Sequence, residues 1–478
     1  MTACSEFPEA ASVAALHESA LRVLETTGVL VQDDEAVALL RARGARCDAR
    51  RVWLDADLVQ QALASAPSSF VLAGRRPELG LPLGGVDGRV VGSGSGAAYM
   101  VDPRPAASGA AVPVMRPGTL ADLVSTVKLG HQLPVIDFNS DCMEPLDLRE
   151  DVRTRRGTHA RLTLSDKAIE WIAGADEDLD DAERVNEILF GSGWHRRPRA
   201  LIVLNTSAPL QLSGETARIL LRWARLGQPS CVTACVMGGT TGPATLAGVL
   251  VVQHAEVLAA LVLSQAAREG SPFVYGGVSA MASLRTGAAH FGTPEFARLA
   301  RATVGLARRC GLPVRAGAAI TDAHAVDARA MAESAAGLAS AALSGAHFLF
   351  QAAGMLSSFN ALSLEKYVLD ADVVVSLRAA LHDVPVGDDD LAVEDIAAVG
   401  PAGGYLDKAH TRRHARDFVR PEPAAPPVLE PFERWAAAGG ERAFAGAARR
   451  VQDLLAAHQP PDDLDAVTRR QLDRYCLA

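Results

Sequence analysis

Four stretches decide the fold of this chain: NTSAPLQ (205–211), CVMGGTTGPATLAGVLVVQHAEVLA (235–259), FVYGGVSAMASLRTGAAHFGTPE (273–295) and GLPVRAGAAITDAHAVDARAMAES (311–334). GAHFLFQAAGM (345–355) and SLEKYVLDAD (363–372) continue the pattern. Each apolar, strand-like segment ends in Gly, Thr, Ser, Asn or His, and an Ala/Leu-rich helical segment follows it. Small and polar residues in this order are typical of a parallel β/α barrel, which builds its active site at the strand ends.

The apolar segments themselves support parallel strands. RALIVLN, PSCVTACV, SPFVYGG, LPVRAGAA and AHFLFQA are continuously apolar rather than alternating, as expected for strands covered on both faces. Their spacing leaves room for one crossover helix each. Cys231 and Cys235 lie in one of these segments, and two thiols are too few for a zinc site, so we expect core residues there.

Helical segments flank the predicted barrel. Residues 12–66 read as three helices separated by loops, and helices follow a proline-rich linker that starts near 421. We therefore predict a (β/α)8 TIM barrel with an N-terminal helical preface and C-terminal helices. The predicted divisions are 1–100 (helical cap and loop), 101–420 (barrel catalytic domain) and 421–478 (helical extension).

The composition suits a globular protein with a large core. Of 478 residues, 49% are apolar and 22% are charged, and the net charge of -9 comes without Lys/Arg tracts. This balance argues against a nucleic-acid or membrane-surface partner. No secretory signal is evident, the longest apolar run (244–252) looks too short to cross a bilayer, and seven cysteines form no disulfide framework. We expect a cytoplasmic protein.

The GSGSG segment at 92–96 has two interpretations. A dinucleotide loop needs a strand before it and a helix after it. The strand RVV is present, but AAYMVDPRPAASG follows, with two prolines and no helical period. We favour a loop that presents Tyr99.

Five motifs resemble those of the trimethylamine methyltransferase family, the corrinoid-dependent amine and betaine methyltransferases. They are NTSAPL (205–210), TGPATLAG with HAEVLA (241–259), LRTGAAHFGTPE (284–295), SLEKYVLDAD (363–372) and VGPAGGYLDKAHT (399–411). ALRVLETTGVLV and DADLVQQALASAPSSFVLAGR match as well, so the resemblance covers essentially the whole chain. It implies a β/α barrel that transfers a methyl group from an amine to the cobalt of a separate corrinoid protein. It also implies a homo-oligomer, with no tightly bound cofactor and no metal site.

One absence narrows the implied substrate. Trimethylamine enzymes of this family carry pyrrolysine, whereas this chain contains only standard residues; relatives without it include enzymes that demethylate quaternary amines such as glycine betaine. A quaternary nitrogen already carries its charge and leaves as a neutral tertiary amine, so no general acid is needed. The protein must hold the cation, align one N–CH3 bond and exclude water.

Candidate site residues follow from these requirements. A quaternary ammonium is held by aromatic faces, each worth roughly 0.5–2 kcal/mol, and by a nearby carboxylate. We expect Tyr99, Tyr275 and Phe359 to hold the cation, although any single aromatic residue can simply fill the core. Polar residues at strand exits complete the predicted substrate site: Asn205, Ser207, Thr240, His324 and Gln351.

Three further residues have open interpretations. Glu256 lies in an apolar helix and therefore needs a partner, either a structural Arg or His or a bound cation; we favour a structural partner, and the same applies to His254. Asp322 can cap a helix. His410 and Thr411 match the family's HT pair, and we predict that they bind the corrinoid at the face of its carrier protein.

The chain departs from the family pattern at His254, where many members have Asn, at His324, where they have Lys, and at Arg329, where they have Gln, but the most important departure is in one loop. The family's G-W-L-E-G-G-L becomes Gly354-Met355-Leu356-Ser357-Ser358-Phe359-Asn360, which removes a Trp and a Glu. The sequence therefore indicates the class of reaction more strongly than it indicates glycine betaine as the substrate. Two alternatives stay open: a biosynthetic methyltransferase or other C–N bond enzyme without corrinoid, and a non-catalytic betaine-binding protein.

Overall fold

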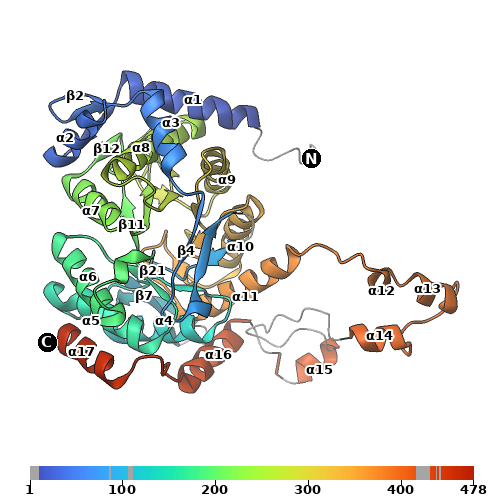
Figure 1. Ribbon diagram of the computed structural model, residues 1–478. Helices are drawn as coiled ribbons and strands as arrows, with labels where there is room; N and C mark the ends of the chain where they lie inside the picture. The colour runs from blue at the N-terminus through green and yellow to red at the C-terminus, as the bar shows by residue number, and fades with distance from the viewer. Residues whose placement is uncertain (1–9, 86–87, 106–110, 416–430, 438, 441–442) are drawn as a thin grey trace.

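A closed sheet of eight parallel strands forms the centre of the molecule (Figure 1). The computed structural model describes residues 10–85, 88–105, 111–415, 431–437, 439–440 and 443–478. In chain order the strands are β6 (Val90–Val91), β9 (Phe138–Asn139), β10 (Ala168–Trp171), β11 (Leu201–Asn205), β13 (Ser230–Ala234), β15 (Phe273–Gly277), β18 (Val314–Gly317) and β19 (Phe348–Phe350). A bridge between Gly92 and Phe138 joins the first strand to the second and closes the barrel, which confirms the predicted fold.

One helix follows each strand and surrounds the barrel. These helices are α4 (Leu120–Gln132), α5 (Glu150–Leu164), α6 (Asp176–Phe190), α7 (Gly214–Arg225), α8 (Leu246–Ala267), α9 (Pro294–Arg309), α10 (Ala328–Leu343) and α11 (Leu364–Ala380). Several begin where a Ser, Thr or Asp side chain accepts a hydrogen bond from the first-turn backbone, such as Thr245, Thr293 and Ser363. The polar residues of the strand–helix motifs therefore act in part as helix caps.

Side chains on each strand alternate between the barrel interior and the helical layer. Leu201 of β11 belongs to the interior cluster with Cys231, Val274 and Phe348, whereas Ile202 packs outward. A hairpin of β4 (Ser69–Leu72) and β5 (Leu81–Gly84) adds Leu72 and Leu83 to this interior cluster. The lower part of the barrel is thus a packed core, and Cys231 is one of its buried residues, as predicted, whereas Cys235 is only partly buried.

The N-terminal preface packs against α8. It contains α1 (Ala10–Thr26), α2 (Asp34–Ala42) and α3 (Ala56–Ser65), all three in contact with α8. It also contains strands that the sequence analysis did not predict: β1 (Val29–Val31), β2 (Arg46–Asp48) and β3 (Arg51–Trp53). They form a sheet in which β1 also pairs with β12 (Gln211–Leu212), a short strand after β11. This small sheet ties the preface to the loop after β11.

Helix α8 is longer and more apolar than we expected from the sequence. Among the described residues it is the one helix that is long and apolar enough to cross a membrane, with a mean hydropathy of 2.0. Its most apolar window is 72% buried, between the barrel and helices α1, α3 and α7. This burial accounts for the apolar composition, because a helix covered on all sides needs no polar face.

Short strands extend the loops at the carboxyl ends of the barrel strands. One group is β14 (Met237–Gly238), β16 (Ala280–Ala282) and β17 (Ala289–His290), and the other is β7 (Tyr99–Pro105), β8 (Ala111–Pro117), β20 (Met355–Leu356) and β21 (Ala361–Leu362). The GSGSG segment thus runs into β7 and not into a helix, so it lacks the helix that a dinucleotide loop requires.

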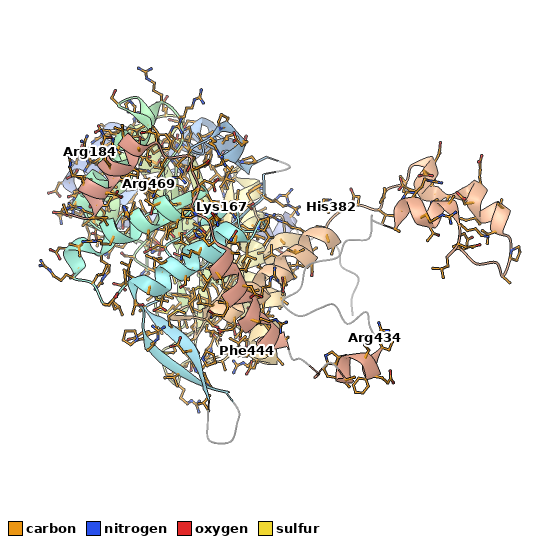
Figure 2. The ribbon with its side chains drawn as sticks, turned by 90° about the horizontal axis from the view of Figure 1, so that it is seen from below. Lys167, Arg184, His382, Arg434, Phe444 and Arg469 are labelled. Carbon is orange, nitrogen blue, oxygen red and sulfur yellow. The ribbon has the colours of Figure 1, made fainter. Side chains whose placement is uncertain are left out.

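The C-terminal region leaves the barrel and returns to it. The chain projects as an arm that carries α12 (Asp388–Leu391), α13 (Val393–Val399) and α14 (Ala409–His414), with α15 (Phe432–Ala437) on the way back (Figures 1 and 2). Then α16 (Ala443–Ala457) packs on α4 and α11, and α17 (Ala466–Cys476) packs on α5 and α6. Of the predicted divisions, the one at residue 100 falls after the first barrel strand, β6. The one at residue 420 falls after α12–α14 of the arm, which lie outside the barrel.

Candidate active site

The mouth of the barrel, at the carboxyl ends of its strands, brings together several predicted residues. Because Leu201 and Val203 contact the interior cluster, alternation along β11 directs Asn205 inward, and its side chain is exposed at the mouth. Gln351 follows β19 and accepts a hydrogen bond from Arg315 Nη2 at 3.1 Å. These two predicted residues are therefore part of the polar layer above the packed core.

Glu170 contributes a buried carboxylate to this polar layer. It lies two residues after Ala168, which contacts the interior cluster, so it also points inward. Its Oε2 accepts hydrogen bonds from Ser95 Oγ at 2.9 Å and from the Asp141 backbone N–H at 3.0 Å. Burial raises the pKa of Glu170. Oε1 has no protein partner among the described residues, which leaves a carboxylate oxygen available to a cation.

Arg315 contributes a buried positive charge from β18. The residue is 3% exposed, its guanidinium lies 4.8 Å from the centroid of the Phe350 ring, and burial lowers its pKa. Nη2 donates to Gln351, while the buried Nε has no partner in the described part of the chain. The charge of Glu170 acts on Arg315, but no carboxylate of the described residues lies within 4.0 Å of it. Two opposite charges thus share the barrel interior without a direct ion pair.

Three loops at the rim are held together by Asp322. Its Oδ1 accepts hydrogen bonds from the Phe291 backbone N–H at 3.0 Å and from Ser358 Oγ at 2.7 Å. The predicted residue His324 lies nearby and contacts Ser357 through Nδ1 and Oγ, 2.8 Å apart. Asp322 therefore links the loops after β15, β18 and β19 instead of capping a helix, and Asp327 caps α10.

The loop that departs from the family pattern forms a left-handed turn. Ser357, Ser358 and Phe359 have φ values of 51°, 56° and 59°. Such a conformation costs roughly 1–2 kcal/mol per non-glycine residue. Backbone N–H groups of Ser357 and Ser358 donate to the carbonyls of Ala323 and Thr321, both at 2.9 Å, and hold the turn. The predicted residue Phe359 packs on Phe291 with ring centroids 4.8 Å apart.

Glu256 holds the NTSAPL loop. From the buried face of α8, its Oε2 accepts from Thr206 Oγ1 at 2.5 Å and its Oε1 accepts from the Leu210 backbone N–H at 2.7 Å. Its hydrogen-bond partners among the described residues are thus a hydroxyl and a backbone group rather than an Arg or a His. Burial raises the pKa of Glu256 to about 7. The predicted residue Ser207 lies inside this loop, partly buried, and its N–H donates to Gln211.

A buried ion pair explains the SLEKYVLDAD motif. Lys366 Nζ donates to Asp370 Oδ2 and to Ser334 Oγ, both at 2.6 Å, and both charged side chains are fully buried. Asp370 Oδ2 also accepts from the Gly354 backbone N–H at 2.8 Å. The motif thus positions the loop after β19 from behind, outside the mouth.

Tyr275 lies away from the mouth. Its ring is fully buried in the layer between β15 and α8, where its hydroxyl bonds to His254 Nδ1 at 2.9 Å. His254 Nε2 in turn bonds to His17 Nδ1 at 2.9 Å, so the partner of His254 is structural. Residues on β15 alternate, and Val274 rather than Tyr275 faces the interior. We therefore leave Tyr275 out of the candidate site.

Tyr99 and Thr240 are both exposed on loops at the mouth end. Tyr99 begins β7, and its register partner is Ala361 of β21, so the loops after β6 and β19 lie side by side there. Tyr99 is 39% exposed. Thr240 Oγ1 bonds to its own turn, at the Met237 carbonyl. Tyr99 thus lies beside the loop after β19, whereas the Thr240 hydroxyl stabilises the turn in which it lies.

The predicted corrinoid-binding residues lie on the projecting arm. His410 Nε2 is 2.9 Å from the Asp389 carbonyl oxygen, and Thr411 Oγ1 donates to the Tyr405 carbonyl at 2.6 Å. Helices run antiparallel to the strands they follow, so the end of α11, where the arm starts, is at the opposite end of the barrel from the mouth. His410 and Thr411 are therefore not near the mouth of their own barrel.

Among the described residues, two clusters of side chains have metal-ligand spacing. His17, His254 and Cys310 form one, and Asp389, His410 and His414 form the other. In the first, a hydrogen bond joins the two imidazoles; in the second, Asp389 contacts both His414 and Arg413.

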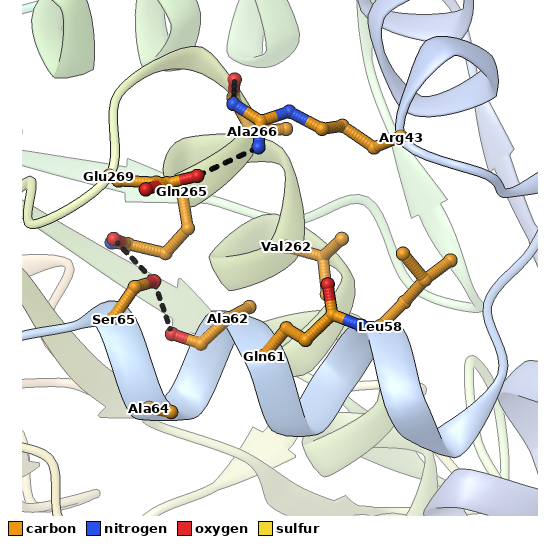
Figure 3. A pocket seen from close by; sticks show the side chains of 10 residues that line it. All are labelled: Arg43, Leu58, Gln61, Ala62, Ala64, Ser65, Val262, Gln265, Ala266 and Glu269. Atoms are coloured by element: carbon orange, nitrogen blue, oxygen red, sulfur yellow. Dashed lines mark hydrogen bonds and ion pairs between the residues drawn. The ribbon is translucent and has the colours of Figure 1, made fainter.

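The cavity drawn in Figure 3 does not belong to the mouth. It has a volume of about 410 Å³ and lies between α3 and the C-terminal half of α8. Its charged groups are paired with each other, Arg43 with Glu269 at 2.9 Å, and Ser65 bonds to Gln265 at 3.1 Å. The charges of this cavity are thus satisfied within the protein, unlike those of Glu170 and Arg315.

The sequence analysis missed Glu170 and Arg315. Each is a single charge inside a continuously apolar strand, AIEW and PVRAG. Such a residue has to be paired or functional, because an isolated buried charge is costly. A lone charge in an apolar strand, together with the alternation of inward and outward side chains along that strand, could have identified both residues.

Comparison with known proteins agrees with this architecture. The family model described as trimethylamine methyltransferase (MTTB) matches residues 3–477. The glycine betaine methyltransferase of Desulfitobacterium hafniense (strain Y51) is 32% identical over 450 residues, covering 93% of this chain and 91% of that protein. Trimethylamine methyltransferase MttB2 of Methanosarcina mazei is 30% identical over 472 residues, covering 96% and 92%.

A solved structure shares the fold. The crystal structure of the monomethylamine methyltransferase MtmB of Methanosarcina barkeri superposes with a TM-score of 0.51 at 12% identity, covering 92% of this chain and 87% of that one. The barrel, the matched family model and the curated relatives lead to the same conclusion. The chain belongs to the trimethylamine methyltransferase family and is a methyltransferase.

Proposed function

We propose that this methyltransferase takes its methyl group from a quaternary, betaine-like amine and passes it to the Co(I) of a corrinoid protein. The observation that carries the substrate assignment is the pair of separated opposite charges, Glu170 and Arg315, in the barrel interior. A zwitterion places its ammonium beside a carboxylate and its carboxylate beside a guanidinium, and so satisfies both. The relatives named above support the reaction class.

Each group has a defined task. Glu170 Oε1 stabilises the ammonium charge, with Tyr99 and Phe359 as aromatic neighbours at the mouth. Arg315 binds the carboxylate through Nε, which no protein group occupies, while Gln351 orients the guanidinium. Asn205 contacts the substrate from β11, and His324 acts from the rim. A corrinoid protein, when bound, would supply the Co(I) nucleophile for one methyl carbon, and the residues of this chain hold that carbon so that the C–N electron pair can remain on nitrogen.

The chain's own residues need to move no proton in this reaction. The departing tertiary amine is neutral, so binding and alignment are the main contributions of the protein. The corrinoid has to approach from the open end of the barrel, where Asn205 and Tyr99 are exposed. His410 and Thr411 are not near that end in their own chain, and no step is assigned to them.

Methyl transfer to Co(I) cobalamin tests the proposal. We expect the absorbance change of cobalt methylation with a betaine, and no change with trimethylamine. Arg315→Lys retains a charge but loses the planar guanidinium; it should raise KM for glycine betaine about 10-fold or more, the equivalent of ~1.4 kcal/mol, and leave choline, which lacks a carboxylate, unchanged. No transfer from any quaternary amine would refute the reaction. An equal change for both substrates would refute the role of Arg315.

A further inference from the structure

The projecting arm exposes an unusual number of apolar side chains. Seven of the seventeen large apolar residues that are exposed in the described part of the chain lie between 384 and 406. They are Val384, Val386, Leu391, Val393, Ile396, Tyr405 and Leu406, and Leu406 is 92% exposed. Exposed apolar side chains gathered on one segment in this way indicate an interaction site.

The arm has an ordered internal structure. Asp389 of α12 accepts from Arg413 Nη2 at 2.7 Å and lies 2.9 Å from His414 Nε2, both on α14. The His410 contact to the Asp389 carbonyl adds to this clasp. Figure 2 shows the arm projecting well beyond His382, away from the barrel. A segment held in shape by its own contacts, with its apolar side chains turned to solvent, is suited to insert into another surface.

A groove on the barrel has the complementary character. It lies between α1, α8 and α9, has a volume of about 660 Å³, and is mostly apolar, with Leu16, Leu246, Val251 and Leu299 among its lining residues. Arg298 and Arg301 are the charged residues of its lining. The first turn of α8 also borders it, and a helix N-terminus favours acidic groups.

The charges of the arm match this groove. Residues 388–399, which form α12 and α13, contain five acidic residues and no basic one. Leu391, Val393 and Ile396 lie among them and supply the apolar part. Apart from Asp389, which the clasp engages, the acidic and apolar side chains of α12 and α13 thus correspond to Arg298 and the apolar side chains of the groove, which favours association.

The arm of one chain is far from its own groove. It leaves the barrel at the end of α11, whereas the groove borders the first turns of α8 and α9, at the mouth end. In Figure 1, α12–α14 lie well to the side of the barrel, away from α1, α8 and α9. A second copy of the chain presents the same groove without this restriction.

We propose that two copies of this chain form a reciprocal dimer in which the α12–α13 segment of each inserts into the α1/α8/α9 groove of the other. Such an isologous contact is closed and two-fold symmetric. It also carries His410 and Thr411, which are remote from the mouth of their own barrel, toward the mouth end of the other copy. This assembly goes beyond the methyl-transfer proposal and does not depend on it.

Light scattering after size exclusion tests the dimer. The wild-type protein should have twice the chain mass of 50.1 kDa. Ile396→Glu on the arm and Ala15→Glu in the groove should each give monomers, because each places a carboxylate where the proposed contact is apolar or meets acidic residues. Both positions are exposed, so circular dichroism should be unchanged. Ala15→Lys is the matched control and should remain dimeric.

Mixing the two glutamate variants distinguishes reciprocal exchange from other interfaces. One heterodimer retains an intact arm and an intact groove, so dimers should reappear in an equimolar mixture. A monomeric wild type would overturn the proposal, as would dimers that survive both substitutions or a mixture that stays monomeric. A wild-type mass that Ile396→Glu does not alter, together with loss of corrinoid-protein binding, would assign the arm to that partner instead.

Discussion

Replacing Glu256 with glutamine should change how the stability of the protein depends on pH. The buried carboxyl has a pKa of about 7, compared with 4.5 for an ordinary glutamate. Between these values the folded state keeps a proton that the unfolded state has released. The free energy of unfolding of the wild type therefore falls as pH rises, and the loss is complete above pH 7. At about 1.4 kcal/mol per pH unit, it reaches about 3 kcal/mol.

The side chain that Glu256→Gln introduces has no such proton equilibrium. Its amide oxygen can still accept from the Leu210 N–H, and Thr206 can reverse its hydroxyl. We expect Glu256→Gln to gain about 2.5 kcal/mol over the wild type on going from pH 5 to pH 8, because part of the loss has already occurred at pH 5. For 478 residues the entropy of unfolding is about 1 kcal/mol/K, so the melting temperatures should diverge by about 2.5 °C.

Thermal unfolding followed by circular dichroism at both pH values measures this divergence. Glu177→Gln, at an exposed position of α6, is the control and should give a difference that does not vary with pH. Only the change with pH is diagnostic, because any constant offset reports packing. If the difference between Glu256→Gln and the wild type is the same at pH 5 and pH 8, the carboxylate is ionised in the folded state and the reasoning is refuted.

Three further substitutions separate structural from binding roles. Asp370→Ala should leave the buried Lys366 charge unpaired and cost about 3–5 kcal/mol of stability, seen as a melting temperature lower by several degrees; an unchanged value would contradict the ion pair's role. Tyr275→Phe should lower stability by about 1–3 kcal/mol through the lost His254 bond, with KM unaltered, and a raised KM would return Tyr275 to the site. Phe359→Ala should raise KM for a quaternary amine between about 2-fold and 30-fold, measured by steady-state methyl transfer, and no change would exclude its ring from cation binding.

The sequence by itself determined the barrel. Continuous apolar strands, helix caps such as Thr245 and Ser363, and regular spacing are local signals, and they specify a β/α barrel whatever the loops contain. The sequence also placed Asn205 and Gln351 at strand ends, because chain position alone decides which end of a strand a residue occupies.

Only the tertiary structure decided which side chains share the mouth. Tyr275 lies near the carboxyl end of an apolar strand, but the alternation of side chains along β15 turns its ring toward His254 and α8. Glu170 and Arg315 come from strands 145 residues apart along the chain, so only barrel closure brings their charges into one interior. Likewise, His410 and Thr411 match a motif, yet the direction in which α11 ends carries them away from the mouth, because each barrel helix runs antiparallel to its strand.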